Sequence, residues 1–131
     1  MNKFLHKWAS DLFPINRSIT GKGVRDTLAY IPNLNIYAVP SGEKVFDWVV
    51  PNEWDIEEAY IEDKNGNRVI DFSNNNLHVV GYSEPVNKWI NINELNKYLH
   101  SIPSQPTAIP YITSYYNKTW GFCLSENQRS K

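Results

Sequence analysis

The clearest structural signal in the sequence is AYIEDKNGNRVIDF, residues 59–72. Polar and apolar residues alternate on both sides of Asn65-Gly66, and such alternation is typical of two half-buried strands. Asn-Gly is a preferred pair for a two-residue type I′ turn, because both turn positions need a positive φ. The stretch therefore predicts an antiparallel β-hairpin with Asn65 and Gly66 at its tip.

The type I′ turn would also determine which residues face each other in the hairpin. It places Ile61 opposite Ile70 and Ala59 opposite Phe72, so that these two pairs form one apolar face. The other expected pairs are Tyr60 with Asp71, Glu62 with Val69, Asp63 with Arg68, and Lys64 with Asn67. We therefore expect a hairpin with one buried face and one face in water.

Strand-like patterns continue on both sides of the hairpin. Residues 34–39 (LNIYAV) and 45–50 (VFDWVV) predict two strands that are joined by a turn at Pro-Ser-Gly. Residues 77–83 (LHVVGYS) predict another strand, and residues 111–124 (YITSYYNKTWGFCL) predict a second hairpin that turns at Asn-Lys. Most of the chain after about residue 40 is thus expected to be a mainly antiparallel β-rich domain.

Three segments carry helix signals. Residues 3–12 place apolar side chains on one helical stripe, namely Phe4, Leu5, Trp8 and Leu12. Residues 20–31 predict a second helix with Thr20 as its N-cap, and residues 91–100 predict a third that starts with a capping-box pattern. The predicted fold class is therefore α+β: two N-terminal helices, then the β-rich domain with one further helix.

Charge and hydropathy indicate which partners to expect. The 131 residues contain 13 Lys and Arg against 14 Asp and Glu, a formal charge of −1, and no window gathers five like charges. A nucleic-acid or membrane surface usually needs a basic patch, so we expect neither contact from this segment. No apolar stretch is as long as the hydrophobic region of a signal peptide or as a membrane span. We therefore expect a cytoplasmic location.

The stretch LFPINRSITGKG, residues 12–23, has three possible interpretations. A phosphate-binding loop would need a glycine where Asn16 stands, a Ser or Thr where Gly23 stands, and a preceding strand rather than a helix. The second interpretation is an interhelical turn whose glycines allow tight backbone geometry. In the third, Arg17, Ser18 and Thr20 border a ligand cleft, with the N-terminus of the second helix directed at a carboxylate or phosphate.

The remaining chemistry-bearing residues suggest no complete active site. The three histidines, His6, His78 and His100, are far apart, and none has a second metal ligand at helical or hairpin spacing. Cys123 lies between Phe122 and Leu124, so it is expected to be a buried small hydrophobic residue rather than a nucleophile. Exposed Trp and Tyr residues could bind a glycan or a peptide.

Four long segments resemble a known family. They are LFPINRSITGKGVRDTLAYI, VPSGEKVFDWVVPNEWDIEEAYIEDKNGNRVIDF, NLHVVGYSEPV and PYITSYYNKTWGFCLS. Together they are similar to the amino-terminal part of bacterial aminopeptidase-like proteins, which are also described as polysaccharide-biosynthesis proteins. The resemblance extends from about Leu12 to Gln128.

The resemblance implies a domain plan and a candidate site. Residues 1–39 would belong to an α/β zinc-exopeptidase-like domain, residues 40–114 to an inserted β-rich domain, and residues 115–131 to a segment returning toward the peptidase-like domain. The candidate substrate-cleft residues are Arg17, Ser18, Thr20 and Trp120. Zinc is implied for a full-length relative, but the resemblance assigns no catalytic or metal-binding residue and no cofactor to this chain.

The metal-binding motifs of such proteins lie beyond the part that this chain resembles. In addition, Ser125 and Gln128 form a helix-start signal close to the last residue. We therefore expect a fragment that shapes the cleft, is inactive alone, and has the remainder of the peptidase-like protein as its partner. Without that partner, the apolar stripes of residues 3–12 and 20–31 would be exposed. The alternative is a stand-alone β-rich binding module for a glycan or peptide.

Overall fold

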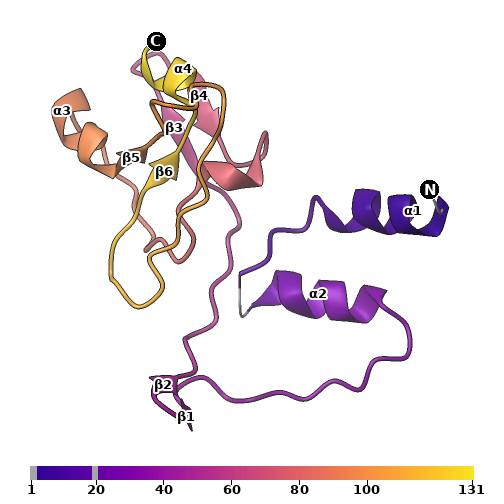
Figure 1. Ribbon diagram of the computed structural model, residues 1–131. Helices are drawn as coiled ribbons and strands as arrows, with labels where there is room; N and C mark the ends of the chain where they lie inside the picture. The colour runs from indigo at the N-terminus through magenta and orange to yellow at the C-terminus, as the bar shows by residue number, and fades with distance from the viewer. Residues whose placement is uncertain (1–2, 19–20) are drawn as a thin grey trace. The chain divides into compact units, whose positions relative to one another are not determined.

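The computed structural model describes residues 3–18 and 21–131 of the chain (Figure 1). The chain divides into two compact units, Met1–Asp55 and Ile56–Lys131, and each is described by itself below. The first unit contains two helices and a small hairpin, and the second contains short strands and short helices. This arrangement confirms the predicted α+β fold class.

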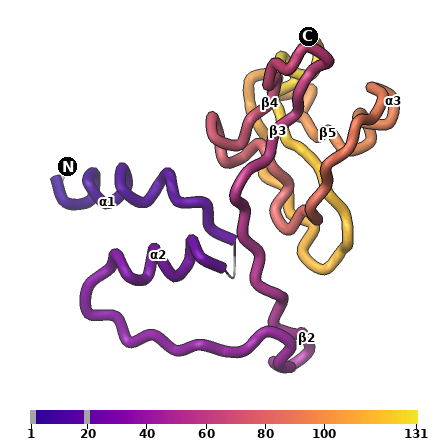
Figure 2. Tube along the Cα trace, turned by 180° about the vertical axis from the view of Figure 1, so that it is seen from behind, coloured from indigo at the N-terminus to yellow at the C-terminus, as the bar shows by residue number. Residues whose placement is uncertain are grey.

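Two helices make up most of the regular structure in the first unit. Helix α1 spans Lys3–Leu12, as predicted, and helix α2 spans Lys22–Tyr30. They lie side by side in Figures 1 and 2. The Trp8 and Tyr30 rings meet edge to face, with a centroid distance of 6.2 Å. The N-cap of α2 is Gly21, and Thr20, the predicted cap, lies outside the described residues. Neither helix contains a fully buried residue. Phe4 and Leu5 of the α1 stripe are exposed, whereas Trp8, Leu12 and the α2 stripe are half-buried, so the expected exposure holds for only part of α1.

The predicted strand at residues 34–39 is wrong, because these residues are exposed and form no strand in the structure. The hairpin lies further along the chain, where β1 (Lys44–Val45) pairs with β2 (Trp48–Val49). Its turn is at Phe46, whose φ is 53°. The predicted turn at Pro-Ser-Gly is present, with the Glu43 N–H donating to the Pro40 carbonyl at 3.3 Å, but it does not join two strands. The predicted strand at residues 45–50 thus folds back on itself, and this leaves residues 34–39 without the neighbour that a strand requires.

The central hairpin of the second unit has the predicted topology but a different turn. Strand β3 (Tyr60–Glu62) pairs antiparallel with β4 (Arg68–Asp71), and the predicted pairs of Tyr60 with Asp71 and of Ile61 with Ile70 are confirmed. The Phe72 N–H donates to the Ala59 carbonyl at 2.9 Å, which continues the predicted register. Ile70 is buried and Tyr60 is exposed, as the two-faced hairpin requires.

The register next to the turn was predicted incorrectly. Glu62 faces Arg68 rather than Val69, and the expected pairs of Asp63 with Arg68 and Lys64 with Asn67 are shifted by one residue. The physical reason is the Asp63 carboxylate, whose Oδ1 accepts hydrogen bonds from the backbone N–H groups of Asn65 and Asn67 at 2.8 and 2.9 Å. These bonds stabilise a longer turn with a bulge, in which Gly66 alone has a positive φ, of 83°.

The C-terminal half of the second unit differs most from the prediction. Residues 111–124 do not form a hairpin; instead β6 (Phe122–Cys123) pairs in parallel with β5 (Leu99–His100). The predicted strand at residues 77–83 is a 3₁₀-helix, η1 (Asn76–His78), followed by single bridges from Val79 to Phe122 and from Gly81 to Thr113. Long-range pairing has therefore replaced the pairing between neighbours in sequence.

The third predicted helix is shorter than expected. Helix α3 spans Ile92–Leu95, continues as the 3₁₀-helix η2 (Asn96–Tyr98), and gives way to β5 at Leu99. The chain leaves the helix because Leu99 belongs to the core, together with Ile70, Phe122 and Leu124. The predicted caps are confirmed: Asn91 accepts the Glu94 N–H, and Ser125 and Gln128 form a capping box before α4 (Glu126–Arg129).

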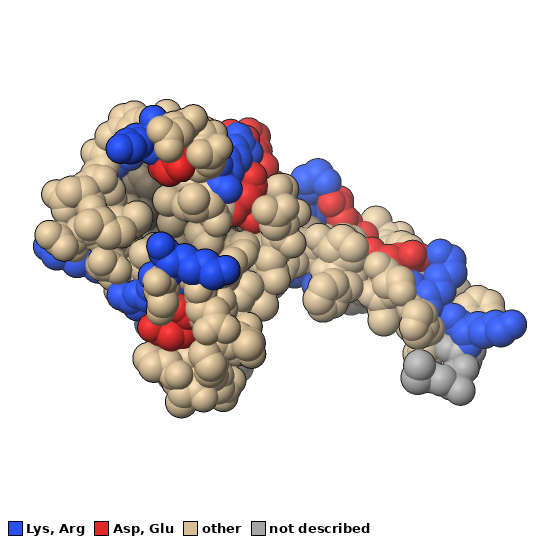
Figure 3. All heavy atoms as spheres, turned by 90° about the horizontal axis from the view of Figure 1, so that it is seen from above, with Lys and Arg blue, Asp and Glu red and all other residues tan. Residues whose placement is uncertain are grey.

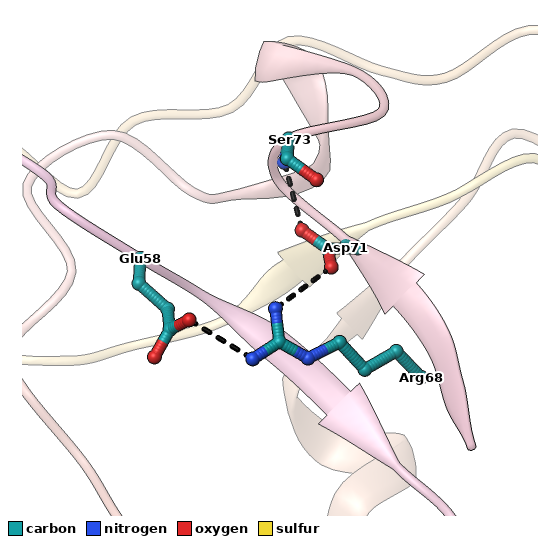
Figure 4. Close-up of polar contacts among 4 residues, drawn as sticks. All are labelled: Glu58, Arg68, Asp71 and Ser73. Carbon is teal, nitrogen blue, oxygen red and sulfur yellow. Dashed lines mark hydrogen bonds and ion pairs between the residues drawn. The ribbon is translucent and has the colours of Figure 1, made fainter.

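An ion-pair network lies on the exposed face of the central hairpin (Figure 4). The Arg68 guanidinium donates to Asp71 at 3.0 Å and to Glu58 at 2.9 Å, and it lies 3.7 Å from the centre of the Tyr60 ring. Hydrogen bonds from the Ser73 hydroxyl and N–H, followed by the bond from Arg68, lower the pKa of Asp71 to about 2. The same carboxylates raise the pKa of Arg68.

The depressed pKa of Asp71 predicts a loss of stability in acid. A carboxyl group whose pKa is lower in the folded than in the unfolded chain stabilises the fold above its unfolded pKa of about 3.9. That contribution disappears as the pH falls from about 4 to about 2. We therefore expect the urea midpoint to fall more steeply across this window in the natural chain than in Asp71→Asn. Equal slopes for the two proteins would contradict the assignment.

Candidate functional site

The turn between α1 and α2 contains three of the four candidate cleft residues. The Arg17 side chain donates from Nη1 to the Leu12 carbonyl at 2.6 Å, across the end of α1. The Ser18 hydroxyl donates to the Trp54 carbonyl at 3.1 Å, so this turn is tied to a segment that lies 36 residues further along the chain. Thr20, the third candidate, lies outside the described residues.

Both glycines of this turn lie against backbone atoms. Gly21 is buried with a φ of 124°, and a Cβ placed on it would lie 2.3 Å from the Trp54 carbonyl oxygen. A Cβ on Gly23 would lie 1.8 Å from the Asn16 carbonyl oxygen. The glycines therefore permit close backbone approach, as the interhelical-turn interpretation requires. Because α1 precedes the turn, the strand that a phosphate-binding loop follows is missing here.

Trp120, the fourth candidate, belongs to a stack of rings in the second unit. Its indole lies on the Tyr98 ring at a centroid distance of 4.0 Å with 15° between the planes, and its other neighbour is the Phe122 ring, edge on at 6.4 Å. The Lys88 ammonium lies 5.3 Å from the Trp120 ring and 5.8 Å from the Tyr98 ring. Trp120 thus packs against the core and also lies close to a cation.

A shallow surface depression lies beside this stack. Its lining residues are Asn91, Asn93, Glu94, Lys97 and Tyr98. Lys88, whose ammonium lies beside both stacked rings, also donates to Glu94 at 3.3 Å. Uncharged amides, one carboxylate and one ammonium can orient a small polar molecule, and the Tyr98 ring supplies an apolar side.

Neither Tyr98 nor Lys88 was predicted from the sequence to belong to this site. Tyr98 was expected in a helix, and 22 residues separate it from Trp120. Stacking between such distant residues has no periodic signal in the sequence. The placement of Arg17 and Ser18 in the first unit and of Trp120 in the second leaves their membership in a common cleft a prediction.

The surroundings of Cys123, His78 and His100 suit a structural role better than a catalytic one. Cys123 is fully buried, and burial raises the pKa of its thiol to about 11, so it is a poor nucleophile near neutral pH. His78 is also buried, in η1 rather than in a strand, with Nδ1 2.7 Å from the Cys123 carbonyl oxygen. His100 lies in β5 rather than in a helical turn, and burial followed by the charge of Arg129 lowers its pKa.

The potential metal ligands among residues 3–18 and 21–131 are dispersed. Among these residues, no three His, Cys, Asp or Glu side chains lie close enough together to hold a metal ion. In the same residues, no helix is long and apolar enough to cross a membrane. Figure 3 shows basic and acidic side chains interspersed on the visible face, without a large patch of one sign.

Comparison with known proteins confirms the resemblance to aminopeptidase-like proteins. A Clostridium acetobutylicum protein described as "Putative polysaccharide biosynthesis protein with aminopeptidase-like domain" is 52% identical over 128 residues, which are 95% of this chain and 29% of that protein. A crystal structure described as a "putative peptidase" from Clostridium acetobutylicum superposes with a TM-score of 0.93 at 49% identity. The superposition covers 98% of this chain and 31% of that chain.

The chain therefore spans less than a third of the length of these relatives. The model of one protein family matches residues 53–131, which are more than half of the chain and include the whole second unit. By this match, the chain belongs to the family described as "Domain of unknown function (DUF2172)".

Proposed function

We propose that this chain is the non-catalytic, cleft-shaping portion of a zinc-dependent aminopeptidase-like protein. The observation that carries the proposal is the superposition of 98% of the chain on 31% of a protein described as a putative peptidase. A catalytic zinc site needs about three protein ligands and a group that activates water. In this proposal those groups come from the remaining part of the longer protein, and this chain contributes Arg17, Ser18, Thr20 and Trp120 to the cleft.

The exposed apolar surface of the first unit supports the proposal that another part of the longer protein packs against it. Phe4 and Leu5 on α1 are 73% and 63% exposed, and neither α1 nor α2 contains a buried residue. Apolar side chains exposed in this way on helices commonly mark a face that another element covers. We infer that the remainder of the peptidase-like protein covers these helices.

The proposal is tested by comparing three proteins. They are this chain, the full-length Clostridium relative, and a chimera in which this chain replaces the matching 29% of that relative. We expect bound zinc and turnover of aminoacyl p-nitroanilides in the two long proteins, and neither in this chain alone. Stoichiometric zinc in this chain, or no zinc and no turnover in the full-length relative, would overturn the proposal.

The chimera also tests the role of Arg17. The Arg17→Ala substitution is expected to raise KM about tenfold, equivalent to about 1.4 kcal/mol, without changing the zinc content. The matched control is Arg25→Ala, since Arg25 is exposed and forms an ion pair with Glu53 on the surface. An equal change of KM in both variants would show that Arg17 has no specific role in the cleft.

A further inference from the structure

Four tyrosines gather around one edge of the second unit. The rings of Tyr82 and Tyr115 stack with a centroid distance of 5.4 Å and 25° between their planes. The Tyr116 ring is tilted by 54° against Tyr115 at the same centroid distance, and Tyr111 is close enough to interact electrostatically with Tyr115. Tyr111 and Tyr116 are 74% and 58% exposed. We name these four residues the tyrosine cluster.

The two stacked residues have unusual backbone conformations. The φ angles of Tyr82 and Tyr115 are 65° and 55°, in the left-handed region, and only two other non-glycine residues in the described chain have a positive φ. A left-handed conformation costs a residue with a side chain roughly 1–2 kcal/mol. Such residues persist where the surrounding structure holds them, and they concentrate at ligand-binding sites.

Ser114 holds the two tyrosine-bearing loops together. It is buried, and its hydroxyl lies 3.1 Å from the Tyr82 carbonyl oxygen and 3.2 Å from the Gly81 carbonyl oxygen. Its backbone N–H donates to Gly81 at 2.9 Å, and the Gly81 N–H donates to Ile112 at 2.9 Å. The two loops therefore support each other, and this holds the backbones of the two stacked tyrosines in place.

The chemistry of the tyrosine cluster favours a neutral ligand. Burial, and then the neighbouring Tyr82, Tyr116 and Tyr111, raise the pKa of the Tyr115 hydroxyl, so this hydroxyl stays uncharged at neutral pH. Each phenol can donate and accept a hydrogen bond, and each ring has an apolar face. A sugar ring has the complementary features, namely a face of C–H groups and hydroxyls that donate and accept.

We propose that the tyrosine cluster is a carbohydrate-binding surface, with Tyr111 and Tyr116 as the exposed contact rings and Tyr82 and Tyr115 as their rigid support. This inference goes beyond the proposed function, because it requires neither zinc nor peptide hydrolysis. It also assigns a ligand class to four tyrosines that have no role in the proposed function.

The test is an NMR titration of the full chain with cellotetraose and with triacetylchitotriose. We expect at least one sugar to shift the aromatic signals of Tyr111 and Tyr116, with a Kd in the range of about 0.1–1 mM. Tyr116→Ala should weaken binding about tenfold, and Tyr116→Phe should weaken it less because the ring remains. The control is Tyr37→Ala, because Tyr37 is 90% exposed but lies in the first unit, and its affinity should be unchanged.

Three outcomes would overturn the proposal. They are the absence of any shift up to about 10 mM sugar, shifts confined to residues outside the tyrosine cluster, and an equal loss of affinity in the Tyr37 variant. A proline-rich peptide that shifts the cluster while both sugars do not would also exclude the carbohydrate assignment. These measurements need no metal, so a negative result here leaves the zinc and turnover results of the longer proteins to be judged separately.

Discussion

Replacing Gly23 with alanine is expected to remove the amide protection of helix α2. The new Cβ would lie 1.8 Å from the Asn16 carbonyl oxygen. Because this oxygen belongs to the backbone, it cannot move aside as the end of a flexible side chain could. Alanine favours a helix over glycine by about 1 kcal/mol, so propensity alone predicts the opposite result. Overpacking of this severity costs about 2–3 kcal/mol or more, and it should therefore dominate.

The measurement is hydrogen–deuterium exchange at residues 22–30 in the full chain. A cost of 2–3 kcal/mol corresponds to exchange that is roughly 30- to 160-fold faster. Asp26→Ala is the matched control on the same helix, because it removes only an exposed ion pair with Lys22. If both variants exchanged like the natural chain, the close approach of Gly23 to Asn16 would be refuted.

Leu124→Ala is expected to have the largest effect in the second unit. Leu124 is 3% exposed and belongs to the core with Ile70, Leu99 and Phe122. Removing a buried leucine side chain leaves a cavity and lowers the free energy of unfolding by about 2–5 kcal/mol. The loss of stability should affect β4 and β6 together, since both strands contribute residues to this core.

Denaturant titration followed by NMR signals of β4 and β6 checks this prediction. Val86→Ala is the control, because Val86 is 46% exposed in a segment without regular structure, and its effect should stay within about 0.5 kcal/mol. A Leu124 variant as stable as the Val86 variant would show that the four residues do not form the core of this unit.

Features that depend on neighbouring residues could be read from the sequence. The stripe of residues 3–12 predicted α1 with its observed bounds, and the caps at Asn91 and Ser125 were found where they were expected. Alternation around Asn65-Gly66 predicted the central hairpin and the pairing of Ile61 with Ile70. Each of these depends on hydrogen bonds or side-chain periods that span only a few residues.

The strand register beside a turn could not be predicted without knowing the side-chain hydrogen bonds there. Asn-Gly favours a type I′ turn, but the Asp63 carboxylate accepts two backbone N–H groups and stabilises a bulged turn instead. The register therefore changed by one residue beside the turn while it stayed correct further from it. In the same way, Thr20 could be suggested as a cap, whereas the observed cap of α2 is Gly21, which lies close to Trp54.

The amino-acid sequence alone was sufficient to predict the α+β class, the first helix, the central hairpin, the caps at Asn91 and Ser125, and the resemblance to aminopeptidase-like proteins. The three-dimensional structure was needed to show that β6 pairs with β5 rather than within residues 111–124, that Trp120 stacks on Tyr98, and that Tyr82 meets Tyr115. The physical reason is distance along the chain. Local patterns record contacts between near neighbours, whereas these pairings join residues more than 20 positions apart and are selected by tertiary packing.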